Sequence, residues 1–161
     1  MPQKENMEPV GNKEWNLNNA QVIILAGARA ELTALKHYLY ICQNDRTFRP
    51  SRYVAFYKDG AIRHLFELID IPYKNCNEKN TPILKNVLQY MNRDKNKDEF
   101  VQVMYLKKVG DIGPIRNDTV DKNGRSTAFT QGHRYTNYQK LMRAKKTSEL
   151  IWLFKDMSQK N

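Results

Sequence analysis

Two stretches of the sequence interleave basic and aromatic side chains closely enough to act together on one ligand. The first contains Arg46, Phe48, Arg49, Arg52, Tyr53 and Tyr57. The second contains His133, Arg134, Tyr135, Asn137 and Tyr138, then Lys140, Arg143, Lys145 and Lys146 with no acidic residue before Glu149. Arginine and lysine bind phosphates, and aromatic faces stack on unpaired bases, at roughly 1–3 kcal/mol per base. The pattern predicts a nucleic-acid-binding surface. The alternative is that the aromatic residues border the core and the lysines form a solvated helix face.

The distribution of charge favours the same class of partner. The formal net charge is +10, from 27 lysines and arginines against 17 aspartates and glutamates. Residues 1–100 carry a net charge of +3 and residues 101–161 carry +7. A positive field attracts polyanions and speeds their association, so nucleic acid is the expected partner. A basic protein that is merely soluble remains the alternative.

Other chemistries find weaker support in the residue pattern. Asp111, Asp118 and Asp121 do not follow the ligand spacing of a calcium loop. The stretch after Gly27 lacks the glycines and the Gly-Lys-Ser/Thr ending of a phosphate loop, which argues against nucleoside triphosphate binding. Cys42 and Cys76 match no metal-ligand spacing and are expected to be free thiols. We therefore predict no catalytic residue, no metal site and no cofactor. A metal-dependent nuclease stays open as an alternative, and its candidate carboxylates are Asp59, Glu67, Asp70 and Glu99.

Apolar patterning predicts the elements that position the first stretch. Val22–Gly27 has the short β-branched run of a buried strand, and a helix is expected over Ala28–His37. Tyr40–Cys42 begins a further strand. Arg52–Tyr57 and Ala61–Ile71 then form a hairpin around the Asp-Gly turn at Lys58–Gly60.

In the second half of the chain, apolar patterning again predicts both strands and helices. The expected elements are a helix over Thr81–Met91, a strand over Phe100–Val109, a long loop over Gly110–Arg125, a strand over Ser126–Gln131, a basic helix capped by Thr136 or Asn137 and ending near Lys146, and a last helix beginning at Thr147. This order is neither a regular β-α repeat nor all-β. It predicts an α+β fold, a small curved and mostly antiparallel β-barrel with peripheral helices.

The domain organisation is expected to be simple. Residues 1–19 form a polar N-terminal segment, and residues 20–161 form a single domain of ordinary size. Trp15 is the exception within the N-terminal segment, since it either docks on the core or offers a face to a base. No apolar run approaches the roughly 18 residues of a membrane span, and the N-terminus lacks the apolar centre of a signal peptide. A cytoplasmic protein without membrane contact is expected.

The sequence RYVAFYKDGAIRHLFEL, which follows a strand and a helix and precedes QGHRYTNYQKLMRAKKTSEL, resembles PUA-like domains. These include EVE, ASCH and YTH relatives and modified-base readers of prokaryotic restriction or defence proteins. The resemblance covers about Gln21–Leu150 and implies a curved barrel whose mouth holds a flipped or single-stranded base. It implies pocket roles for Trp15, Tyr53, Phe56, Tyr57 and Tyr135, and backbone contacts by Arg46, Arg49, Arg52, Arg134 and Lys140, to which the basic helix adds Arg143. The chain departs from the readers of methylated bases in lacking an aromatic cage at fixed spacing.

The leading hypothesis is a non-catalytic nucleic-acid-binding domain that takes DNA or RNA, and recognition of a modified base stays open. A nuclease is the second hypothesis. The third is a protein-interaction module that joins other subunits of a restriction or defence system through Trp152 and the final helix.

Overall fold

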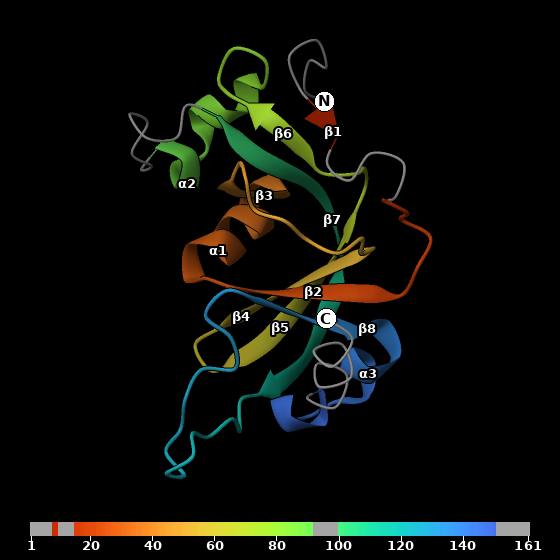
Figure 1. Cartoon of the computed structure of the whole chain (residues 1–161), viewed down its shortest axis with the longest axis vertical. Helices are drawn as coiled ribbons and strands as arrows, with labels where there is room; N and C mark the ends of the chain where they lie inside the picture. The colour runs from red at the N-terminus through yellow and green to blue at the C-terminus, as the bar shows by residue number, and fades with distance from the viewer. Residues whose placement is uncertain (1–7, 10–14, 92–99, 151–161) are drawn as a thin grey trace.

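The computed structural model describes residues 8–9, 15–91 and 100–150, whose arrangement is drawn in Figure 1. The strands are β1 (Glu8–Pro9), β2 (Gln21–Ala26), β3 (Leu39–Gln43), β4 (Tyr53–Lys58), β5 (Ala61–Leu68), β6 (Tyr73–Cys76), β7 (Val101–Arg116) and β8 (His133–Asn137). The helices are α1 (Ala28–His37), α2 (Leu88–Met91) and α3 (Tyr138–Arg143), with short 3-10 helices η2 (Pro82–Asn86) and η3 (Thr147–Leu150).

The strands form one strongly curled sheet in the order β1-β6-β7-β5-β4-β2-β8, with β3 also paired to β7. The β2–β4 pair is parallel, and the other pairings of the described strands are antiparallel. The predicted α+β fold with a curved, mostly antiparallel sheet is therefore confirmed. Its barrel is half open, and its helices are few.

Strand β7 is the element that curls the sheet. Its first half pairs with β3 and β6, and its second half pairs with β5. In Figure 1 it runs from the region of β3 and β6 down to the region of β5. The pairing of β5 with β7 shifts register twice, between Ile62 and His64 and between Leu65 and Phe66. Such bulges bend a strand and increase its twist, which wraps the sheet around its concave face.

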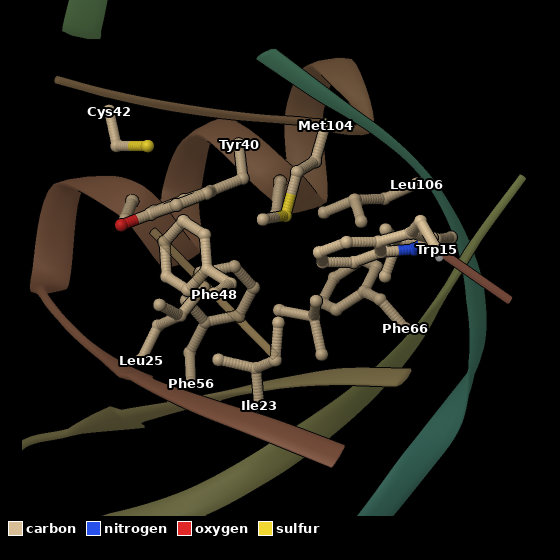
Figure 2. Packing of buried hydrophobic residues seen from close by; sticks show 14 residues of the cluster. Trp15, Ile23, Leu25, Tyr40, Cys42, Phe48, Phe56, Phe66, Met104 and Leu106 are labelled. Carbon is tan, nitrogen blue, oxygen red and sulfur yellow. The ribbon is translucent and has the colours of Figure 1, made fainter. Parts of the chain in front are cut away.

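The concave face holds the inner core, shown in Figure 2. Alternate residues of β2, Ile23 and Leu25, point into it together with Phe56 of β4 and Phe66 of β5, and all four are fully buried. Helix α1 lies against this core through Ala30 and Ala34. Trp15 also lies in it and is only 6% exposed.

The convex side of the sheet carries two further cores. One lies between Val22 and Ile24 of β2 and the segment that contains Phe129, Leu141 and Leu150. The other lies where β3 and the start of β7 meet the segment around η2, and its members are Leu39, Ile41, Tyr73, Cys76, Leu84, Val87, Tyr90, Val101, Val103 and Tyr105. Strands buried on both faces in this way read as nearly continuous apolar runs.

Several boundaries differ from the sequence-based expectation. The predicted helix over Thr81–Met91 is wrong as one element, because it divides into η2 and α2 around Val87, whose backbone is extended. The strand predicted over Phe100–Val109 continues to Arg116, because β5 supplies a partner beyond the apolar run.

The strand predicted over Ser126–Gln131 is also wrong, because its only ladder contact in the described chain is an isolated bridge between Ser126 and Val120. The strand at this point is β8, which begins at His133 and pairs with β2. Helix α3 ends at Arg143, before the predicted end near Lys146, because the backbone of Ala144 is extended. The helix expected after Thr147 begins as η3, whereas Trp152 and Glu99 lie outside the described residues.

Parts of the predicted N-terminal segment contact the sheet. Strand β1 pairs with β6 through Glu8 and Pro9, and Trp15 lies in the inner core. Across the described ranges, no helix has the length and apolarity needed to traverse a bilayer.

Candidate nucleic-acid interface

The chain between β3 and β4 carries the first basic-aromatic stretch, and we call residues 46–52 the mouth segment. Its far end is anchored to the start of β2. The Gln21 side chain donates to the Pro50 carbonyl at 3.2 Å and to the Ser51 hydroxyl at 2.9 Å. The Arg52 N–H donates to the Gln21 carbonyl at 3.2 Å. These bonds hold the mouth segment against β2, which pairs with β4 on one side and with β8 on the other.

Arg46, at the start of the mouth segment, is fixed from several directions. Its Nη1 donates to the Tyr40 hydroxyl at 2.6 Å, and its Nη2 lies 3.0 Å from Nδ1 of His133. The guanidinium carbon lies 4.9 Å from the centroid of the Phe48 ring. Its backbone carbonyl accepts a bond of 2.8 Å from the side chain of Gln102, which is fully buried in β7. The charged group is thereby held in one orientation.

Arg49 makes the second contact between the mouth segment and β8. Its N–H donates to the Tyr135 hydroxyl at 2.9 Å, and its guanidinium carbon lies 5.2 Å from the Tyr135 ring centroid. The rings of Phe48, His133 and Tyr135 follow one another with centroid separations of 4.9 and 5.4 Å. We call Arg46, Phe48, Arg49, His133 and Tyr135 the inner cluster.

The contact between Arg46 and His133 determines the state of the imidazole. A guanidinium can only donate, so Nδ1 must accept, and the proton of neutral His133 is then on Nε2. Burial, followed by the positive charges of Arg46 and Arg49, lowers the pKa of His133 below its usual 6.5. Neutral His133 can therefore orient Arg46 without repelling it.

A cavity of about 370 Å³ opens next to the inner cluster. Its walls are the end of β2 and the start of α1, the strand β3, and Arg46. Small side chains at Ala26, Gly27 and Ala30 leave this space open. Arg46 and Tyr40 belong to both the cavity wall and the hydrogen-bond network described above.

A second group of basic and aromatic side chains lies on the convex face. Arg52 pairs with Glu67 at 2.7 Å and lies 5.1 Å from the Tyr53 ring centroid. Tyr53 in turn contacts Tyr138 of α3 at a centroid distance of 5.0 Å. This group continues through Tyr57, which lies 6.2 Å from Phe129, and Arg134, whose guanidinium carbon lies 5.0 Å from the same ring. We call Arg52, Tyr53, Tyr57, Phe129, Arg134 and Tyr138 the outer cluster.

Helix α3 extends the positive surface from the end of β8. Asn137 caps it by accepting a 2.8 Å bond from the Lys140 N–H, which agrees with the predicted cap. Arg143 is exposed and Lys140 half-buried. Both line a shallow cavity of about 300 Å³ together with Glu149. Their positions suit contacts with a phosphate backbone.

The five side chains predicted to form a base pocket are divided among three places. Trp15 and Phe56 lie in the inner core, with 6% and 0% exposure, so neither offers a face to a base in this conformation (Figure 2). Tyr53 and Tyr57 belong to the outer cluster. Tyr135 alone belongs to the inner cluster. Among the predicted basic residues, Arg46 contacts His133 and Arg49 contacts Tyr135, whereas Arg52 and Arg134 lie with the outer cluster.

Sequence reasoning missed Tyr40 and Gln102, which position Arg46. Tyr40 was read only as the start of a strand, and Gln102 as one residue of an alternating strand. A glutamine between two apolar neighbours of a buried strand is a signal, because a buried amide must find hydrogen-bond partners. Here Arg46 supplies one of them.

The carboxylates proposed for a nuclease are spread over the fold. Asp59 lies in the β4–β5 turn, Glu67 is paired with Arg52, and Asp70 bonds the Tyr73 hydroxyl and the Ile71 N–H. Among the residues that the structure describes, no three His, Cys, Asp or Glu side chains gather where they could hold a metal ion. Asp111 instead bonds Lys108 and His64, which lower the pKa of this exposed carboxyl.

Comparison with known proteins adds no relative to this picture. No protein-family model matches the chain, and no match is found among the curated proteins or the solved structures. Any function assigned to the inner cluster must therefore rest on its own geometry and chemistry.

Proposed function

We propose that this protein is a non-catalytic nucleic-acid-binding domain that holds a flipped or single-stranded base beside the inner cluster, as PUA-like domains do. The observation that carries the proposal is the meeting of the two basic-aromatic stretches. Residues 46–49 contact His133 and Tyr135 of β8, although more than 80 residues separate them in the chain. The curled sheet with few helices is compatible with a PUA-like domain. Restriction or defence assemblies are the proposed setting.

The roles that we propose for the individual residues follow from the exposure of their side chains and from their contacts. Arg49, Arg52, Lys140 and Arg143 are at least partly exposed and would contact phosphates. The Tyr135 ring and the 370 Å³ cavity would receive the base. Extruding a base costs a few kcal/mol, and stacking with hydrogen bonds to its edge would have to offset that cost.

A titration of short single-stranded and double-stranded oligonucleotides at two salt concentrations tests the proposal. We expect binding at low salt that weakens steeply as salt rises, because each phosphate contact releases counterions. The variant Arg49→Gln should bind every sequence more weakly and lower the salt slope by about 1. Fluorescence anisotropy measures both quantities.

The matched control is Arg125→Gln, which removes the same charge from an exposed loop far along the chain from the mouth segment. It should keep the wild-type affinity to within the small effect of net charge. Absence of binding to every oligonucleotide at low salt would overturn the proposal. Equal losses for Arg49→Gln and Arg125→Gln would show that binding follows net charge alone and not the inner cluster.

A further inference from the structure

Arg46 is fixed without a counter-ion, whereas Arg52 of the same mouth segment pairs with Glu67. Within the described ranges, no carboxylate lies at ion-pair distance from it. Its partners are neutral groups instead, namely the Tyr40 hydroxyl, the imidazole of His133 and the ring of Phe48. A half-buried cation with neutral partners retains the capacity to bind an acceptor-rich ligand.

The hydrogen bonds of Arg46 leave part of the guanidinium unused. A guanidinium has five N–H groups, and two of them are taken by Tyr40 and His133. Because Arg46 lines the cavity of about 370 Å³, its remaining donors can be reached by a ligand in that cavity. The bonds from Nη1 and Nη2 fix the plane of the group, so these donors keep fixed directions.

A planar set of donors with fixed directions discriminates among bases. Guanine presents two acceptors, N7 and O6, on one edge, and arginine binds this pair with two parallel hydrogen bonds. Adenine places a donor next to N7, cytosine presents a donor, and thymine presents a single acceptor on the corresponding edge. On this edge of the bases, only guanine satisfies two arginine donors at once.

We propose that the cavity beside Arg46 selects guanine, with Arg46 donating to N7 and O6 of the base. This inference rests on the proposed function and names the base that the same site recognises. Arg49, whose guanidinium lies over the Tyr135 ring and which is partly exposed, is suited instead to a phosphate. Tyr40 and Gln102 act as positioning residues, because the Tyr40 hydroxyl accepts from the Arg46 guanidinium and the Gln102 side chain donates to the Arg46 carbonyl.

The test uses a short thymine-rich single strand with one variable position, measured by fluorescence anisotropy at low salt. That position carries guanine, 7-deazaguanine, adenine or no base. We expect the wild-type protein to prefer guanine over 7-deazaguanine and adenine by roughly 5- to 150-fold, the range for a good bidentate contact. Arg46→Lys keeps the charge and loses the planar fork, so it should lower this preference to near 1 while still binding the strand. Arg125→Lys is the matched control and should keep the preference.

The positioning role of Tyr40 has its own measurement. Tyr40→Phe keeps the ring that packs against Phe56 and removes the hydroxyl that accepts from Arg46. The guanine preference should fall while binding to the strand without the base stays the same. A purely structural role would lower both equally.

The possible results separate the two proposals. Equal affinity for guanine, 7-deazaguanine and the abasic strand would overturn guanine selection and leave nucleic-acid binding in place. Loss of affinity for the abasic strand in Arg46→Lys, with no change in base preference, would assign Arg46 to a phosphate and also overturn it. No binding to any strand would overturn the proposed function itself. The comparison of bases with the wild-type protein does not depend on whether a variant folds.

Discussion

The inner and outer clusters both combine basic and aromatic side chains and both draw on the mouth segment and β8, yet they differ in what surrounds their charges. In the inner cluster, Arg46 and Arg49 face rings and neutral hydrogen-bond partners beside a cavity. In the outer cluster, Arg52 is neutralised by Glu67, and Arg134 lies against Phe129, which is 1% exposed. Composition alone does not distinguish the two. Pairing and burial do.

Strand alternation explains how neighbours in sequence come to serve different faces. In β8, His133 and Tyr135 contact the mouth segment, and Arg134 between them points to Phe129. In β4, Phe56 enters the inner core, and Tyr53 and Tyr57 pack in the convex core. Alternate side chains of a basic-aromatic strand therefore lie on opposite faces of the sheet. In β8, the face that carries His133 and Tyr135 contacts the mouth segment.

The largest expected effect comes from the two neighbouring aromatic residues of β4. Phe56→Ala should lower the free energy of unfolding by about 3–5 kcal/mol, since it opens a cavity in the inner core. Tyr57→Ala should cost clearly less, because Tyr57 is only half-buried on the convex side. Urea unfolding at neutral pH measures both. Equal losses would contradict the assignment of these two residues to different environments.

The next effect in size concerns the charge of the outer cluster. Arg52→Gln should weaken oligonucleotide binding less than Arg49→Gln, because Glu67 already compensates the Arg52 charge at 2.7 Å. Glu67→Gln should raise the affinity by up to a few-fold, since it frees that charge for a phosphate. Anisotropy titrations at low salt compare the three variants. A larger loss for Arg52→Gln than for Arg49→Gln would move the binding surface to the outer cluster.

The smallest expected effect is a pH dependence that arises in the inner cluster. His133 has a folded-state pKa below its unfolded value of 6.5, so the unfolded chain binds more protons between these two values. Its contribution to stability is complete above pH 6.5, falls as the pH is lowered, and levels off below the folded-state pKa. Urea unfolding from pH 5 to 8 should show a weaker slope in this window for His133→Gln than for the wild-type protein. An identical slope would mean that neither burial nor the charges of Arg46 and Arg49 lower the pKa of His133.

Much of the fold could be predicted from local pattern. The β-branched run before Gly27, the apolar spacing of α1 and the Asp-Gly turn at Asp59 and Gly60 each carry their own signal, and the corresponding elements are present. Strand β8 was missed because its HRYTN sequence has no apolar alternation. Its pairing with β2 supplies the strand conformation, which is a tertiary effect. The same holds for the extension of β7 beyond Val109.

The site was predictable in its residue types and not in its contacts. The sequence identifies Arg46, Arg49 and Tyr135 as candidates, but the register that brings Tyr135 to Arg49 depends on the β2–β8 pairing. Composition alone does not distinguish Phe56 from Tyr57, because both are aromatic residues of the same strand. Assigning the inner side of β4 from its alternation would have placed Phe56 in the core and Tyr57 on the opposite face. Trp15 was left between two roles, and its 6% exposure places it in the core.

The parallel pairing of β2 with β4 also bears on how this protein can change. Two neighbouring parallel strands require a crossover connection that returns the chain to the end of the sheet where the first strand began. Here α1, β3 and the mouth segment form this connection, and the mouth segment is its final part. A substitution at an exposed position of the mouth segment, such as Thr47, alters no rung of the β2–β4 ladder, whereas Phe48 belongs to the inner core. The exposed surface of the mouth segment can therefore change in evolution while the ladder beneath it is kept.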